Sequence, residues 1–131
     1  MQKPKKDNLV LITGGAGFIG AHLASALVKR GYRVRAMDVL VKPNHGTKPP
    51  AWLDKKVHFL RGDVRKKKDW EKALKGVSYV FHLAGYMDYR MDFSNYVRSN
   101  TESTALLYEV IVEMKLPIKK VVLASSQAVY G

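Results

Sequence analysis

Three glycines near the start of the chain have the spacing of a phosphate-binding turn. Gly14, Gly17 and Gly20 follow a G-x-x-G-x-x-G pattern between an apolar run and a helical pattern. The first glycine permits a tight turn, the second lets backbone approach a pyrophosphate, and the third lets the helix pack closely on the sheet. The helix start, with Phe18 and Ile19, adds unpaired N–H groups directed at the phosphates. The pattern predicts a dinucleotide-binding turn.

An acidic residue follows at the offset that such a turn requires. Asp38 lies 24 positions beyond Gly14 (38 − 14), close to the roughly 20 residues expected for a ribose-binding carboxylate. Such a carboxylate accepts hydrogen bonds from both ribose hydroxyls and repels a 2′-phosphate, which favours NAD over NADP. Arg33 and Arg35 lie on the same expected strand and leave NADP open as an alternative.

Two further strand ends carry candidate cofactor-binding residues. We expect Asp63 and Val64 beside the adenine, with the Asp63 side chain reaching its amino group; a Gly-Asp turn that only ends a strand is the alternative. We also expect Leu83, Ala84 and Gly85 to run close to the cofactor, because small residues let backbone approach a ligand. These residues and the glycine turn would meet at one edge of a sheet.

The elements that would position these residues alternate along the chain. The expected strands are residues 9–13, 33–38, 57–61, 79–83 and 120–124. The expected helices are residues 18–30, a short one through Trp70 and Leu74, and residues 93–114, with a loop over 39–53. Alternation of this kind indicates an α/β fold with a parallel sheet covered on both faces. Right-handed crossovers then predict a Rossmann-type, doubly wound sheet in the order 3-2-1-4-5.

Two of these helices have apolar residues at helical spacing, which predicts their buried faces. In the first helix these residues are Ile19, Leu23, Ala26 and Leu27. In the long helix they are Leu107, Val110, Ile111 and Met114.

Composition is that of one globular domain. The 131 residues are 47% hydrophobic and include no cysteine, so disulfides and thiolate metal sites are excluded. No apolar run is long enough for a signal peptide or a spanning helix, and we expect a soluble, cytoplasmic protein. His22, His45, His58 and His82 lack the spacing of a metal site, so we expect no metal.

The net charge of +12 is the one unusual feature of the composition. The lysines are spread out, and no aromatic residues are interleaved with them as in a base-stacking surface. This favours a solvated basic surface over nucleic-acid binding, and some of the charge could attract an anionic, diphosphate-bearing substrate. The lysines in question are Lys3, Lys5, Lys6, Lys66, Lys67, Lys68, Lys119 and Lys120.

Taken together, these motifs resemble the NAD-dependent epimerase/dehydratase group of the extended short-chain dehydrogenase/reductases. The resemblance runs from Leu9 to Gly131. It implies a nucleotide-sugar epimerase or dehydratase that uses NAD, acts through a transient keto-sugar and is often a homodimer. The motifs that carry it are residues 13–20, Asp38, residues 62–64, residues 82–84, Asn100 and residues 125–131.

The resemblance also implies roles for three residues outside the glycine turn. Ser126, four residues before Tyr130, corresponds to the catalytic hydroxyl that hydrogen-bonds the sugar oxygen, and Gln127 would line the sugar pocket. Asn100 would help to hold the active-site strand and the nicotinamide end of the cofactor. The alternatives are an ordinary strand-end serine for Ser126 and a solvated polar residue for Asn100.

The family's general base, a tyrosine in a Tyr-x-x-x-Lys pair, has no match in the chain; Tyr108, for example, has no lysine four residues later. The resemblance therefore implies that residues 1–131 are an NAD-binding Rossmann domain, incomplete at its carboxyl end, without the substrate-binding region and inactive alone. Two alternatives remain open. One is an NAD-dependent dehydrogenase or reductase of a non-sugar alcohol such as a sterol, and the other is a non-catalytic NAD-sensing regulator.

Overall fold

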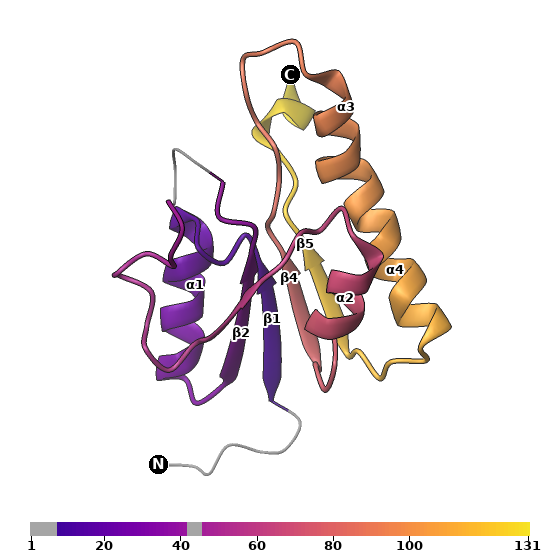
Figure 1. The fold of residues 1–131 in the computed structure, drawn as a ribbon. Helices are drawn as coiled ribbons and strands as arrows, with labels where there is room; N and C mark the ends of the chain where they lie inside the picture. Colours follow the sequence, from indigo (N-terminus) through magenta and orange to yellow (C-terminus); the bar gives the residue numbers. More distant parts are fainter. Residues whose placement is uncertain (1–7, 42–45) are drawn as a thin grey trace.

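Five parallel strands form one sheet in the order β3-β2-β1-β4-β5 (Figure 1). A computed structural model describes residues 8–41 and 46–131, so His45 and Lys3, Lys5 and Lys6 lie outside the described residues. The predicted α/β class and strand order are confirmed. The strands are β1 Leu9–Thr13, β2 Arg33–Asp38, β3 His58–Arg61, β4 Tyr79–His82 and β5 Lys120–Leu123.

Helices cover both faces of the sheet, with α1 on one side and α2 and α4 on the other (Figure 1). The helices are α1 Phe18–Lys29, α2 Lys67–Ala73, α3 Phe93–Tyr96 and α4 Ser103–Glu113. A π-helical turn, η1 Val97–Glu102, joins α3 to α4, and a 3-10 turn, η2 Gln127–Tyr130, follows β5.

The central strand β1 is buried on both faces, as expected for a strand inside a parallel sheet. Leu11 packs in a core that includes Trp70 of α2 and Leu107 of α4. Its neighbour Ile12 points the other way and packs in a core that includes Ala24 of α1. This alternation fixes the carboxyl end of β1, where the glycine turn begins, between two packed layers.

The buried face of α1 differs from the predicted one. Ile19 is 70% exposed and Ala26 is also exposed, so that part of the prediction is wrong. Leu27 is buried as predicted, and the other buried residues of α1 are Gly20, Ala21 and Ala24. Small side chains allow α1 to lie closer to the sheet than a face of large residues would, and this rotates the larger apolar residues outward.

The predicted long helix over residues 93–114 is interrupted. A π-helical turn separates α3 from α4, and Met114 is 41% exposed at the end of the predicted apolar face. Ser103 Oγ donates to the Ser99 carbonyl at 2.6 Å, and Thr104 Oγ1 donates to the Asn100 carbonyl at 3.3 Å. Hydroxyls that bond carbonyls four residues back compete with the helix ladder and bend it. The interruption lies at the turn that carries Asn100.

The helix α4 ends at a lysine whose backbone conformation favours glycine. Lys115 has φ +50, and the Leu116 N–H donates to Ile111 O at 3.0 Å, as in a helix end that usually carries glycine. Lys115→Gly should therefore raise the free energy of unfolding by roughly 0.5–1 kcal/mol, because glycine adopts this conformation without strain. Chemical denaturation measures the change. Lys119→Gly, placed before β5, is the control and should not stabilise.

Candidate dinucleotide-binding site

The glycine turn is closed by its own backbone. Gly14 has φ +68, and its carbonyl accepts a hydrogen bond from the Gly17 N–H at 3.1 Å. A Cβ at Gly20 would press on that same carbonyl and lie 2.8 Å from Gly15 Cα. The first and third glycines of the motif are thus required by conformation and packing, as the sequence predicts.

The middle glycine is different. Gly17 has φ −71 and ψ 170, a conformation that any residue adopts. A Cβ there would meet, within 4 Å, only Gly14 O at 3.2 Å, so its outer side is otherwise open. Phe18 and Ile19 follow at the helix start and are 78% and 70% exposed. This surface has room for a diphosphate at the N-terminus of α1.

The structure also requires a glycine at position 15, which sequence reasoning did not predict. A Cβ at this position would lie 2.5 Å from Ala36 Cβ and 3.0 Å from Ala36 Cα. The Gly15 N–H also donates to the Met37 carbonyl at 3.2 Å. Gly15 therefore brings the turn against β2. The second glycine of the Gly14–Gly15 pair was the signal in the sequence.

The structure places Asp38 beside the glycine turn. Its Oδ2 accepts from the Ala16 N–H at 3.1 Å, and its Oδ1 accepts from the Leu40 N–H at 2.9 Å. Leu40 reaches this position with φ +58, a conformation that leucine rarely adopts. A carboxylate has about four acceptor sites, so each oxygen keeps capacity for a ligand hydroxyl. Sequence reasoning missed Ala16 and Leu40.

The two arginines of β2 are poorly placed to bind a 2′-phosphate beside Asp38. Arg35 Nη1 donates to the Ala73 and Lys75 carbonyls at 2.5 and 2.9 Å, at the end of α2. Arg33 begins the strand that Asp38 ends, so about 16 Å of extended chain separates them. Neither arginine of β2 therefore supports the NADP alternative, whereas Arg61, the register partner of Asp38 on β3, is exposed at the same edge of the sheet.

A buried hydrogen-bond network connects the ends of β1 and β4 to α4. Thr13 Oγ1 lies 2.6 Å from His82 Nδ1, and His82 Nε2 lies 3.1 Å from Ser103 Oγ. Because Ser103 Oγ donates to the Ser99 carbonyl, it accepts from His82, which therefore carries its proton on Nε2. Thr13 then donates to Nδ1. The network is satisfied with a neutral imidazole, and His82 is buried at the strand end as predicted.

The neutral state of His82 makes stability depend on pH. Burial lowers the pKa of His82 from 6.5 to about 4. The unfolded chain therefore binds a proton more readily, and the stabilisation is complete above pH 6.5 and lost as the pH falls toward 4. The loss of unfolding free energy is at most about 3 kcal/mol, measurable by denaturant titration across this range. His82→Gln should flatten the profile, whereas the control His58→Gln, at an exposed histidine, should not. A flat wild-type profile would contradict the neutral assignment.

Asp63 and Val64 follow β3, at the carboxyl edge of the sheet. Asp63 is 8% exposed, and both oxygens of its carboxylate accept hydrogen bonds from Arg65. Burial raises the pKa of Asp63, but the hydrogen bonds and charge of Arg65 outweigh this and hold the pKa below its usual value. The Val64 carbonyl accepts from Trp70 Nε1 at 2.7 Å. Contact of Asp63 with adenine stays a prediction.

The segment after β4 lies against the glycine turn. The Leu83 and Ala84 N–H groups donate to Thr13 Oγ1 at 3.2 and 3.1 Å. A Cβ at Gly14 would lie 3.0 Å from Ala84 N. Gly85 continues the same segment, so the residues predicted to run close to the cofactor do lie next to the turn that would hold its diphosphate.

Asn100 holds the next residue of this segment with both ends of its amide. Its Oδ1 accepts from the Tyr86 N–H at 2.6 Å, and its Nδ2 donates to the Tyr86 carbonyl at 2.9 Å. Both of these bonds go to the segment after β4. The expected influence on the nicotinamide end stays a prediction.

Ser126 and Gln127 lie just beyond β5. The Ala124 N–H donates to the His82 carbonyl at 3.1 Å, which places this chain end at the same edge of the sheet as His82. Ser126 Oγ accepts from the Ala128 N–H at 3.1 Å, and both Ser126 and Gln127 are exposed. The catalytic and substrate roles of these residues stay predictions.

Residues 8–41 and 46–131 contain neither a cluster of metal ligands nor a membrane-spanning helix. No group of three histidines, aspartates or glutamates is placed to hold a metal ion. No helix in these ranges is long and apolar enough to cross a membrane.

The fold and the site define an α/β domain of the dinucleotide-binding class: a glycine turn with an open middle glycine, and a carboxylate at the end of β2 fixed beside it. Comparison with known proteins identifies the family of the chain. Residues 10–131 match the NAD dependent epimerase/dehydratase family, and the chain belongs to that family.

Relatives of known activity cover nearly the whole chain. The UDP-glucose 4-epimerase 3 of Oryza sativa subsp. japonica is 32% identical over 93% of the chain. The sterol-4-alpha-carboxylate 3-dehydrogenase, decarboxylating, of Mus musculus is 33% identical over 98%. The chain spans 35% and 32% of the lengths of these two proteins.

A solved structure agrees with the sequence comparison. The UDP-glucuronic acid 4-epimerase of Bacillus cereus, in complex with NAD, superposes with a TM-score of 0.79 at 32% identity. The match covers 94% of this chain and 41% of that one. The similarity therefore concerns the part of these enzymes that corresponds to the sheet described above.

Proposed function

We propose that the chain binds NAD across the first βα turn and forms the cofactor-binding part of a nucleotide-sugar epimerase or dehydratase. The observation that carries the proposal is the Asp38 carboxylate, fixed by the Ala16 and Leu40 N–H groups beside a glycine turn with an open middle glycine. Membership of the NAD dependent epimerase/dehydratase family supports it.

The residues of the chain would bind and orient the cofactor. Asp38 keeps free acceptor sites for two ribose hydroxyls, and the open surface at Gly17 leaves room for the diphosphate at the start of α1. The segment at Ala84 lies beside the same turn. Bound NAD would accept hydride from a sugar carbon and return it.

Ser126 would orient the sugar. Its Oγ accepts a hydrogen bond from the Ala128 N–H, which leaves its own O–H available as a donor. Donation to the oxygen of the reacting sugar hydroxyl would hold that oxygen at the edge of the sheet where the cofactor site lies. Gln127, exposed next to it, would contact the sugar.

The test is a conversion assay on the full-length protein with NAD and a panel of nucleotide sugars that includes UDP-glucose and UDP-glucuronic acid. We expect an epimer, or a dehydrated keto-sugar, without net formation of NADH. Sugar NMR identifies the product and absorbance measures NADH. Calorimetry showing no uptake of NAD or NADH would overturn the proposal.

One alternative activity has an observation in its favour. The mouse sterol-4-alpha-carboxylate 3-dehydrogenase matches 98% of the chain, so the same cofactor site could serve a net oxidation of a non-sugar alcohol. In that case NADH would accumulate in proportion to product with a sterol-type alcohol, and the nucleotide sugars would remain unchanged.

A further inference from the structure

We propose that Arg65 is a positioning residue that couples the adenine end of the cofactor site to the segment following β4, residues 85–92. The inference rests on the proposed function, because it presupposes that the adenosine end of the cofactor lies beside Asp63. It goes further by assigning a role to a residue outside the glycine turn and by connecting two parts of the site.

One end of Arg65 contacts both oxygens of the Asp63 carboxylate. Asp63 Oδ1 accepts from the Arg65 N–H and from Nε, both at 2.9 Å. Asp63 Oδ2 accepts from Nη2 at 2.8 Å and from Nε at 3.2 Å. The single Nε hydrogen is shared between the two oxygens, so three N–H groups contact a carboxylate with about four acceptor sites, and the fourth site, on Oδ2, is occupied only weakly by the longer Nε contact. The bond at 3.2 Å is the longest and is the one most easily given up.

The other end of Arg65 reaches α3. Arg65 Nη1 donates to Asn95 Oδ1 at 3.0 Å, and Asn95 Nδ2 donates to Asp92 Oδ2 at 2.6 Å. Asp92 Oδ2 also accepts from the Tyr86 hydroxyl at 3.1 Å. A chain of four side chains thus runs from Asp63, through Arg65 and Asn95, to Asp92 and the start of the segment after β4.

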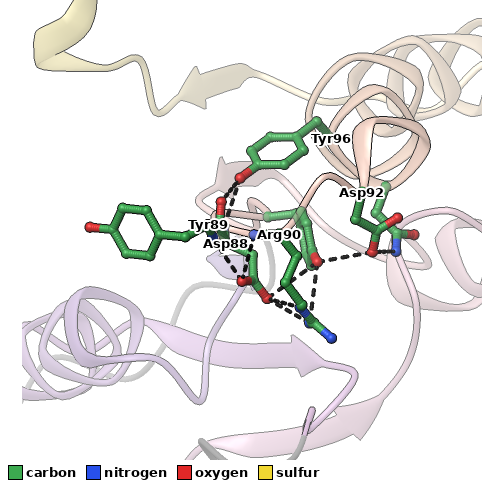
Figure 2. A network of polar contacts seen from close by, with 7 residues as sticks. Asp88, Tyr89, Arg90, Asp92 and Tyr96 are labelled. Atoms are coloured by element: carbon green, nitrogen blue, oxygen red, sulfur yellow. Dashed lines mark hydrogen bonds and ion pairs between the residues drawn. The ribbon is translucent and has the colours of Figure 1, made fainter.

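The segment that receives this chain is internally well bonded. Asp88 Oδ1 accepts from the Tyr89 N–H at 2.7 Å and Asp88 Oδ2 from Arg90 Nε at 2.8 Å; the Tyr96 hydroxyl also contacts the Asp88 backbone. Figure 2 shows these residues gathered around Asp88, with Asp92 alongside. Because these hydrogen bonds connect the residues of the segment to one another, a displacement of Asp92 would move the other residues of the segment as well.

Adenine binding would act on the first link of this chain. An adenine amino group that donates to Asp63 needs an acceptor site that Arg65 now occupies. Release of the long contact between Arg65 Nε and Asp63 Oδ2 lets the guanidinium of Arg65 turn toward Asn95. This rotation strengthens the hydrogen bond from Arg65 to Asn95 Oδ1. A planar guanidinium can span both partners, whereas a lysine ammonium at this position would reach only one.

The test uses ADP, which supplies the adenosine and diphosphate of the cofactor but not its nicotinamide end, with hydrogen exchange of the backbone amides of residues 86–92 in the full chain. In wild type we expect bound ADP to slow this exchange roughly 3- to 10-fold, the size typical of coupling between sites. Asn95→Ala should bind ADP with nearly wild-type affinity but lose the slowing. Arg65→Lys, which keeps the charge beside Asp63, should lose it too. Ser94→Ala, at an exposed neighbour on α3, is the matched control and should keep it.

Fluorescence of Trp70 reports separately on the adenine end, because its Nε1 bonds the Val64 carbonyl beside Asp63. In a Trp52→Phe background, ADP should change this signal equally in wild type and in Asn95→Ala. Two results would overturn the coupling alone. One is that ADP still slows amide exchange in Asn95→Ala and Arg65→Lys. The other is that ADP changes the Trp70 fluorescence of wild type without slowing amide exchange. Failure of wild type to bind either ADP or NAD overturns the proposed function and the coupling together.

Discussion

Alanine at Gly20 is expected to destabilise the domain by more than about 3 kcal/mol, because the added Cβ meets backbone that cannot move aside. It would press on Gly14 O and lie 2.8 Å from Gly15 Cα, so α1 would have to shift away from the sheet. Alanine at Gly17 should cost less than about 1 kcal/mol of stability, because the φ and ψ of Gly17 suit any residue.

The same pair of variants separates folding from binding. At Gly17 the new methyl group would lie where the diphosphate approaches, and overpacking of about 1–3 kcal/mol corresponds to a roughly 5- to 150-fold rise in Kd for NAD. Denaturant titration gives the stabilities and calorimetry gives the affinities. A Gly17→Ala variant that binds NAD as wild type does would show that no ligand approaches this face.

The order of the strands could be predicted from the sequence because each rule involved is local. The short apolar runs and the helical patterns between them identify a βαβ alternation, and the handedness of crossovers then leaves few topologies. Asp38 was predicted beside the glycine turn for the same reason, since the carboxyl ends of β1 and β2 are neighbours in a parallel sheet.

The interruption of the long helix and the buried face of α1 depend on contacts between distant residues. The buried face of α1 is set by how closely Gly20 approaches Gly14. The helical spacing of apolar residues does not reveal this approach, because it favours large residues such as Ile19 for the buried face. The π-helical turn follows from hydroxyl bonds at Ser103 and Thr104, and serine and threonine occur in many uninterrupted helices.

Arg65 illustrates the same limit in the candidate site. In the sequence it is one of 23 lysines and arginines, and nothing local separates it from a solvated surface cation. Only the fold brings Asn95, 30 positions later, within 3.0 Å of its guanidinium. Local motifs therefore predict which residues contact the cofactor, and these contacts stay predictions, whereas the residues that support them had to be found in the structure.

Removal of the Asp38 carboxylate should have the largest effect on cofactor choice. Each of the two hydrogen bonds between the carboxylate and a ribose hydroxyl contributes about 1.5–3 kcal/mol, so Asp38→Ala should raise the Kd for NAD by at least roughly 100-fold. The same change removes the repulsion of a 2′-phosphate, and the ratio of the Kd values for NADP and NAD should fall. Calorimetry with both dinucleotides measures this ratio.

The ratio of the two Kd values is a sound test because both dinucleotides bind the same variant. Loss of the hydrogen bonds from the Ala16 and Leu40 N–H groups changes both affinities alike and cancels in the ratio. Asp54→Asn is the matched control: Asp54 Oδ1 accepts from the Lys56 N–H at 2.8 Å, as Asp38 does from the Leu40 N–H, but it lies in the loop before β3. This control should leave both Kd values unchanged. If Asp38→Ala weakened NAD and NADP equally, Asp38 would only shape the turn, and the carboxylate would not contact the ribose.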